Sequence, residues 1–137
     1  TILTGAFICS QEFARRFAGE EGHIINIGAL TGIQGRKNGV NYCSARAGVL
    51  ALTKCLALEL APKIRVNCVT PGWIETEEVT ERYQLQIEEN YQRALAAVPL
   101  GKLGTPEDVS RMIEFLVCES TYITGQNFLV DGGKLMR

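Results

Sequence analysis

Histidine is nearly absent from this 137-residue chain, and its five cysteines form no close pair. The single histidine, His23, opens a short β-branched run and is expected to be a partly exposed structural side chain. Without a C-x-x-C pair or a second histidine, the donor set of a zinc site is missing, so no metal site is expected. The cysteines are odd in number and widely spaced, which predicts reduced, buried thiols. They are Cys9, Cys43, Cys55, Cys68 and Cys118.

An excess of one charge is also missing, because 14 basic residues stand against 15 acidic ones and the formal net charge is -1. This balance offers no chain-wide attraction to nucleic acid or to an anionic membrane, and neither is expected as a partner. No run of about 18 apolar residues occurs, and the segment 1–5 lacks the basic start of a secretion signal. The expected compartment is therefore the cytoplasm.

Alternating helical and strand-like patterns fill a chain of domain size with 46% hydrophobic residues. Apolar residues at helical spacing indicate helices, and short β-branched runs that end at glycine or proline indicate strands. The predicted helices span 3–18, 40–60 and 106–117, and the predicted strands span 23–27, 64–69 and 128–130. This alternation is typical of a parallel sheet of the dinucleotide-binding type. The expected fold class is α/β, and with so few strands residues 1–137 are expected to form a single partial Rossmann-type, doubly wound domain.

Two further segments have their own patterns. A glycine-punctuated loop is predicted over 28–39. The segment 75–98 is amphipathic and carries six glutamates against Arg82 and Arg93, which predicts a solvated acidic face. Such a face argues against an acidic carrier protein as a partner.

The predicted helix over 40–60 is unusually apolar. Its polar residues between 44 and 58 are only Ser44, Arg46, Thr53 and Lys54. A helix of this composition has to be covered on more than one side, by its own sheet and by a second surface. A partner subunit is the expected second surface, so a homodimer or homotetramer is predicted.

A Tyr-x-x-x-Arg pattern occurs at Tyr42 and Arg46, and three segments around it carry further motifs. They read His-Ile-Ile-Asn-Ile-Gly-Ala-Leu-Thr-Gly at 23–32, Arg-Val-Asn-Cys-Val-Thr-Pro-Gly-Trp-Ile-Glu-Thr at 65–76, and Tyr-Ile-Thr-Gly-Gln-Asn-Phe-Leu-Val-Asp-Gly-Gly at 122–133. In this order they resemble the short-chain dehydrogenase/reductase family over essentially the whole chain. The likeness is to the carboxyl-terminal half of such an enzyme, and it is strongest to the bacterial 3-oxoacyl-(acyl-carrier-protein) reductases.

The resemblance implies an oxidoreductase that uses NAD or NADP and interconverts a small-molecule carbonyl and alcohol. It implies that Tyr42 is the acid/base and that Arg46 stands where the family has a lysine, one helical turn away on the same face. Both residues would also contact the cofactor. The loop that would contact the nicotinamide carboxamide contains Pro71, Gly72, Ile74 and Thr76.

The chain departs from the family pattern at three positions. Ala29 stands at the serine that polarises the substrate oxygen, Arg46 at the lysine, and Ile2 at an asparagine of the proton relay. In the family the phosphate-binding glycine-rich turn lies well upstream of these residues. Activity of the 137 residues alone is therefore expected to be weak.

Two hypotheses follow. The chain is part of a longer oxidoreductase whose first half binds the cofactor, or it is a non-catalytic, dimerising remnant of that family. Structural alternatives also remain for single residues: Tyr42 as a core residue, Arg46 as a surface cation, and Pro71–Gly72 as a strand stop. The sequence upstream of Thr1 would discriminate between the two hypotheses.

Overall fold

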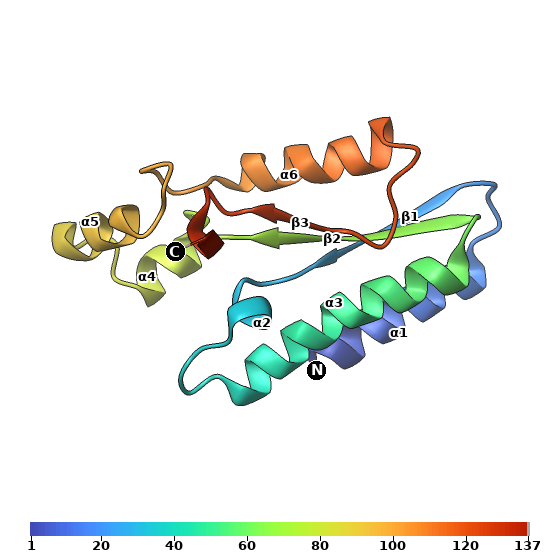
Figure 1. Cartoon of the computed structure of the whole chain (residues 1–137), viewed down its shortest axis with the longest axis horizontal. Coiled ribbons are helices and arrows are strands. Elements are labelled where there is room, and N and C mark those ends of the chain that lie inside the picture. The colour runs from blue at the N-terminus through green and yellow to red at the C-terminus, as the bar shows by residue number, and fades with distance from the viewer. Residues whose placement is uncertain (137) are drawn as a thin grey trace.

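The computed structural model describes residues 1–136, which form a three-stranded parallel sheet with helices on both faces (Figure 1). The strands are β1 (Gly22–Ile27), β2 (Ile64–Pro71) and β3 (Asn127–Val130), in the order β1-β2-β3. The α-helices are α1 (Ile2–Arg16), α2 (Thr31–Gln34), α3 (Val40–Leu60), α4 (Glu77–Arg82), α5 (Glu88–Ala96) and α6 (Pro106–Glu114). A π-helix, η1 (Phe115–Glu119), extends α6, and a 3-10 turn, η2 (Lys134–Met136), follows β3.

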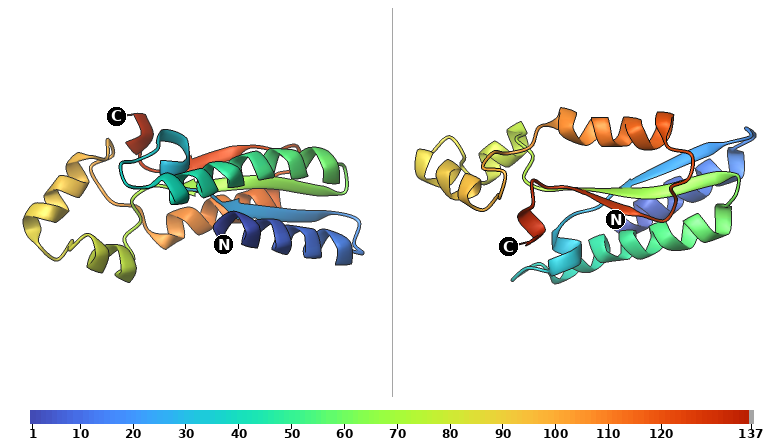
Figure 2. Two further views of the ribbon diagram at one scale, coloured as in Figure 1. Left: turned by 90° about the horizontal axis from the view of Figure 1, so that it is seen from below. Right: turned by 45° about the horizontal axis from the view of Figure 1, so that its top comes forward.

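The sheet lies between two helical layers. Helices α1 and α3 run side by side along one face, and α6 covers the other (Figures 1 and 2). The central strand β2 is buried from Ile64 to Thr70, as expected for a parallel strand covered on both faces. The predicted α/β class with a parallel sheet is confirmed.

Buried polar side chains connect these layers. Asn26 Nδ2 donates a hydrogen bond of 3.0 Å to Thr53 Oγ1, which joins β1 to α3. Arg65 on β2 donates from Nη2 to the carbonyls of Leu116 and Ser120. These carbonyls belong to η1 and to the residue after it, where the N–H of Ser120 bonds to the carbonyl of Phe115 five residues back, as in a π-helix.

The predicted elements are present, with differences in detail. The helix over 40–60 matches α3, whereas the predicted helix over 106–117 ends as α6 at Glu114 and continues as η1. The glycine-punctuated loop contains the short helix α2. The acidic segment 75–98 forms two helices, α4 and α5, over a separate apolar core of Leu85, Ala94, Val98 and Leu103.

The expectation of buried cysteines was wrong for most of them. All five are free, but only Cys68 on β2 is buried, and Cys43 is half-buried. Cys9, Cys55 and Cys118 are exposed because they lie on helical faces that point away from the sheet. Whether a cysteine on a helix is buried or exposed therefore depends on which face of that helix packs against the sheet.

Helix α3 is partly covered by its own chain, with Val49, Thr53, Leu56 and Ala57 buried. It packs on β2, α1 and α2, and exposes Val40 and Leu58 near its two ends.

Within residues 1–136, no helix has both the length and the apolar character needed to cross a membrane.

Candidate active site

A cavity of ≈ 660 Å³ lies at the carboxyl ends of β1 and β2. This edge is where open α/β sheets bind their ligands. Its walls come from the residues after β1, from α2 and the start of α3, from the loop between β2 and α4, and from α6. All six residues predicted from the sequence line this one cavity: Tyr42, Arg46, Pro71, Gly72, Ile74 and Thr76.

Tyr42 lies in the first turn of α3 and is half-buried. Its backbone N–H donates to Asn41 Oδ1 at 2.8 Å. The guanidinium carbons of Arg36 and Arg46 lie 5.2 Å and 5.3 Å from the centre of its ring. Both distances are within the range of cation–π attraction, so the tyrosine and the two arginines form one stack.

Arg46 follows Tyr42 by one turn of α3 and reaches back to the sheet. Its Nη1 donates a hydrogen bond of 2.8 Å to the carbonyl of Ile27, the last residue of β1. Its Nε is buried and has no hydrogen-bond partner among the described residues. The guanidinium therefore joins α3 to β1 beside the tyrosine.

The three departures from the family pattern occupy different places. Ala29 lines the cavity but brings no hydroxyl to it. Ile2 opens α1 and is not among the cavity residues. The sequence-based argument missed Thr31, which also lines the cavity and whose buried Oγ1 has no partner among residues 1–136. A signal was available, because Thr31 stands two residues after Ala29 in the same loop.

The loop after β2 forms the opposite wall. The N–H of Gly72 bonds to the carbonyl of Val130, and a Cβ at Gly72 would meet Asp131 Cα at 2.5 Å, so no larger residue fits. Ile74 pairs with Gly104 in a parallel bridge made by the carbonyl of Trp73 and the N–H of Glu75. In such a bridge the N–H and carbonyl of Ile74 point away from Gly104, and within residues 1–136 no backbone group bonds to them.

Thr76 is the N-cap of α4, where its Oγ1 accepts the N–H of Val79 at 3.3 Å. The hydroxyl proton of Thr76 remains available to donate.

Beneath the cavity, burial raises the pKa of the Cys68 thiol, so this cysteine stays protonated and is unsuited to act as a nucleophile.

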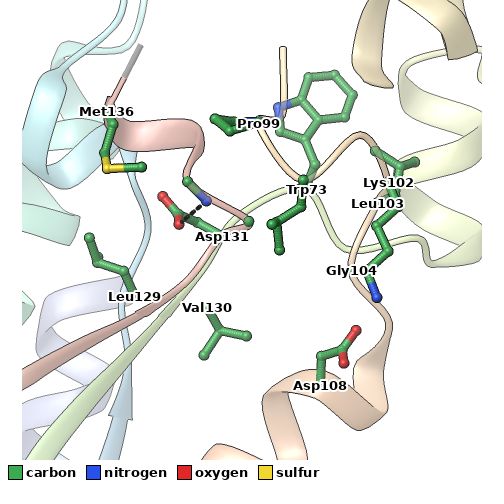
Figure 3. Close-up of a pocket in the computed structure, with 13 residues that line it drawn as sticks. Trp73, Pro99, Lys102, Leu103, Gly104, Asp108, Leu129, Val130, Asp131 and Met136 are labelled. Atoms are coloured by element: carbon green, nitrogen blue, oxygen red, sulfur yellow. Dashed lines mark hydrogen bonds between the residues drawn. The ribbon is translucent and has the colours of Figure 1, made fainter. Parts of the chain in front are cut away.

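A second cavity, of ≈ 460 Å³, lies behind the loop after β2 (Figure 3). Its walls are mostly apolar and include Trp73, Leu103 and Met136. Asp131 closes one side, accepting the N–H groups of Gly133 and Leu135 at 2.8 Å each. It contains none of the predicted site residues and shares only Trp73 with the lining of the first cavity.

The covered parallel sheet, with a ligand cavity at its carboxyl edge, defines the carboxyl-terminal part of a Rossmann-type domain. A family model described as Enoyl-(Acyl carrier protein) reductase matches residues 1–134. The chain belongs to the short-chain dehydrogenase/reductase family, and the resemblance seen in the sequence is confirmed.

Similar proteins give the same assignment. The 3-oxoacyl-(acyl-carrier-protein) reductase FabG of Aquifex aeolicus is 40% identical over 134 residues, which are 96% of this chain and 52% of that protein. A solved Agrobacterium tumefaciens structure with bound NADP has a TM-score of 0.90 and 35% identity, over 99% of this chain and 56% of that one. The apo SCOR enzyme of Clostridium thermocellum has a TM-score of 0.83 and 38% identity, over 98% of this chain and 51% of that one. The chain thus spans about half the length of the relatives it matches.

Proposed function

We propose that this chain supplies the tyrosine-bearing half of an NAD- or NADP-dependent oxidoreductase that interconverts a carbonyl and an alcohol. The observation that carries the proposal is the convergence of Tyr42, Arg46 and the loop after β2 on one cavity. Residues 1–137 would then form a partial Rossmann-type domain. The proposed substrate is a small molecule, and the protein is proposed to act as a homodimer or homotetramer in the cytoplasm.

The residues present fit the nicotinamide end of the cofactor. Ile74 offers a free backbone N–H and carbonyl, which suit an amide partner, and Thr76 keeps a hydroxyl proton to donate. Arg46 offers its guanidinium for a ribose hydroxyl in place of the family's lysine. Bound at this site, NAD or NADP would supply or accept the hydride.

Tyr42 would move the proton in this reaction. In the reductive direction its phenol donates to the carbonyl oxygen as the oxygen becomes an alcohol, and the phenol regains a proton from solvent. Ala29 cannot polarise the carbonyl, a loss comparable with about 10²–10³ in rate for one missing donor. The proposed enzyme is therefore slow.

A second candidate is a non-catalytic, dimerising module of the same family. Ala29 favours it, because the missing hydroxyl weakens catalysis without affecting the fold. Exposed apolar side chains on α1, among them Phe7 and Ile8, also suit an association surface. The two candidates differ in whether Tyr42 affects turnover.

The test joins the amino-terminal half of the Aquifex aeolicus relative to this chain and measures oxidation of NADH or NADPH with a small ketoester. Tyr42→Phe should lower the rate by about 10²-fold or more, because it removes the proton donor. Tyr122→Phe is the matched control, since Tyr122 is 100% exposed and lies outside the cavity. Turnover that is unchanged by Tyr42→Phe would refute the proposed acid/base, and a folded, inactive hybrid would favour the non-catalytic module.

A further inference from the structure

Cations without an ion-pair partner line the candidate cavity on both of its walls. Arg36 and Arg46 both stack on Tyr42, and Lys134 lies 5.2 Å from the centre of the Trp73 ring. Within residues 1–136, none of these three cations has a carboxylate at ion-pair distance. The ion pair at this cavity is a different one, between Arg82 and Glu78 at 3.5 Å.

The wall that carries Arg36 and Arg46 also has unused hydrogen-bond donors. Arg46 Nε and Thr31 Oγ1 are buried without a partner, whereas buried polar atoms in folded proteins are normally paired. Arg36 is exposed, and the structure shows no hydrogen bond from its guanidinium to another described residue. In a chain with a net charge of -1, this concentration of unmatched positive charge is local.

We propose that Arg36 and Arg46 bind an oxyanion, a carboxylate or a phosphate, carried by the small molecule that occupies the cavity. A guanidinium presents parallel N–H donors that match the oxygens of such a group. Stacking on Tyr42 restrains both side chains and so reduces the entropy lost on binding. The anion would lie beside the tyrosine that the proposed function requires.

Acidic residues also stand near the cavity. Helix α4 carries the exposed residues Glu77, Glu78 and Glu81, of which Glu78 lines the cavity and pairs with Arg82. An extended acidic protein surface would lie against these exposed carboxylates, which disfavours it more than a small anion held at Arg36 and Arg46. The proposed ligand is therefore a small anion.

This inference rests on the proposed function in one respect, that the bound anion is the substrate, but its test requires no turnover. Binding of 3-oxobutanoate and of its neutral methyl ester to the chain would be measured at low ionic strength by NMR titration. The two ligands share the ketone and differ in charge, so the acid should bind on the order of tenfold more tightly. Inorganic phosphate is titrated as a third ligand. If it binds more tightly than 3-oxobutanoate, the natural ligand carries a phosphate and not a carboxylate.

Matched variants show whether the arginine is responsible. Arg36→Gln should remove the preference for the anion, whereas Lys37→Gln should keep it, because Lys37 is exposed and lies outside the cavity lining. Thermal melts confirm that each variant is folded, and Arg36→Lys should retain part of the preference. Equal binding of acid and ester, or equal loss in the two Gln variants, overturns the anion site. Either of these two outcomes leaves the proposed role of Tyr42 unaffected, because that role is tested only by turnover.

Discussion

At Arg46, one guanidinium serves both the fold and the candidate site. Its Nη1 donates a hydrogen bond of 2.8 Å to the carbonyl of Ile27, and its guanidinium carbon lies 5.3 Å from the centre of the Tyr42 ring. A lysine here would have a compact ammonium that cannot hold the carbonyl and stack on the ring in the same way. The residue therefore combines a structural contact with a position next to the proposed acid/base.

Restoring the family's residues should raise activity in a completed chain. Ala29→Ser returns the polarising hydroxyl and Arg46→Lys returns an ammonium, so the double variant should gain up to about 10²–10³ in rate. The hydroxyl and the ammonium act as one unit around Tyr42, so their combined effect should exceed the sum of the single variants in free energy. Steady-state oxidation of the reduced cofactor measures the gain. If the double variant is no faster than the unaltered completed chain, and Tyr42→Phe also leaves the rate unchanged, the proposed roles of these site residues are contradicted.

His23 should make the stability of the chain depend on pH. Burial, and secondarily the charge of Arg65, lower its pKa below the ordinary value of 6.5, while Glu21 opposes the shift. The unfolded chain therefore binds more protons than the folded chain, and the free energy of unfolding rises with pH. The contribution is complete above about pH 6.5 and is lost as the pH falls through and below it.

Urea unfolding between pH 5 and pH 8 measures this effect. His23→Gln should flatten the pH dependence in this window, because glutamine does not titrate. A slope that persists in the variant would show that another group is responsible.

Among the elements, α6 has a well-formed start. Thr105 Oγ1 accepts the N–H of Asp108, and Asp108 Oδ2 accepts the N–H of Thr105, a reciprocal capping box with Pro106 in the first turn. These bonds lower the pKa of the Asp108 carboxyl, so they persist to acidic pH. The sequence predicted this helix start because caps are local.

Thr105→Ala should destabilise the chain by about 1 kcal/mol, because the amide of Asp108 loses its acceptor. The expected decrease in Tm is roughly 3–6 °C for a chain of this size. Thr4→Ala, at an exposed position in the first turn of α1, is the control and should be neutral or slightly stabilising. Equal melting temperatures for Thr105→Ala and the unaltered chain would show that the box contributes little.

For the whole molecule, the layers are unequally covered. Helices α1 and α3 lie side by side (Figure 2). They expose apolar side chains, including Phe7 at 45%, Ile8 at 51% and Leu58 at 84%. Strand β1 is an edge of the sheet, with its outer backbone groups unpaired by any described strand. Both features favour association of this chain with further protein surface.

The chain should sediment as a dimer or larger species at micromolar concentration. Ile8→Arg should shift it toward monomer, since a buried arginine would be unpaired at the interface. Tyr122→Arg, at a fully exposed site away from α1, should leave the sedimentation coefficient unchanged. A monomeric, cooperatively melting chain would contradict the proposed surface.

The sequence by itself determined the local elements and the family. Helical and strand periodicities, the start of the helix at Pro106 and the Tyr-x-x-x-Arg spacing depend on residues within a few positions of one another, so they can be read along the chain. Burial depends on distant contacts, which is why the environment of Cys9 and Cys55 was predicted wrongly.

Tertiary structure alone decided what stands around Tyr42. The parallel register of β1 with β2 brings the end of β1 and the loop after β2 to one edge, where Arg46 bonds to Ile27. The turn before α3 then brings Arg36 onto the tyrosine ring. No periodicity encodes these contacts, because they depend on how separate elements pack and on the path of an irregular loop.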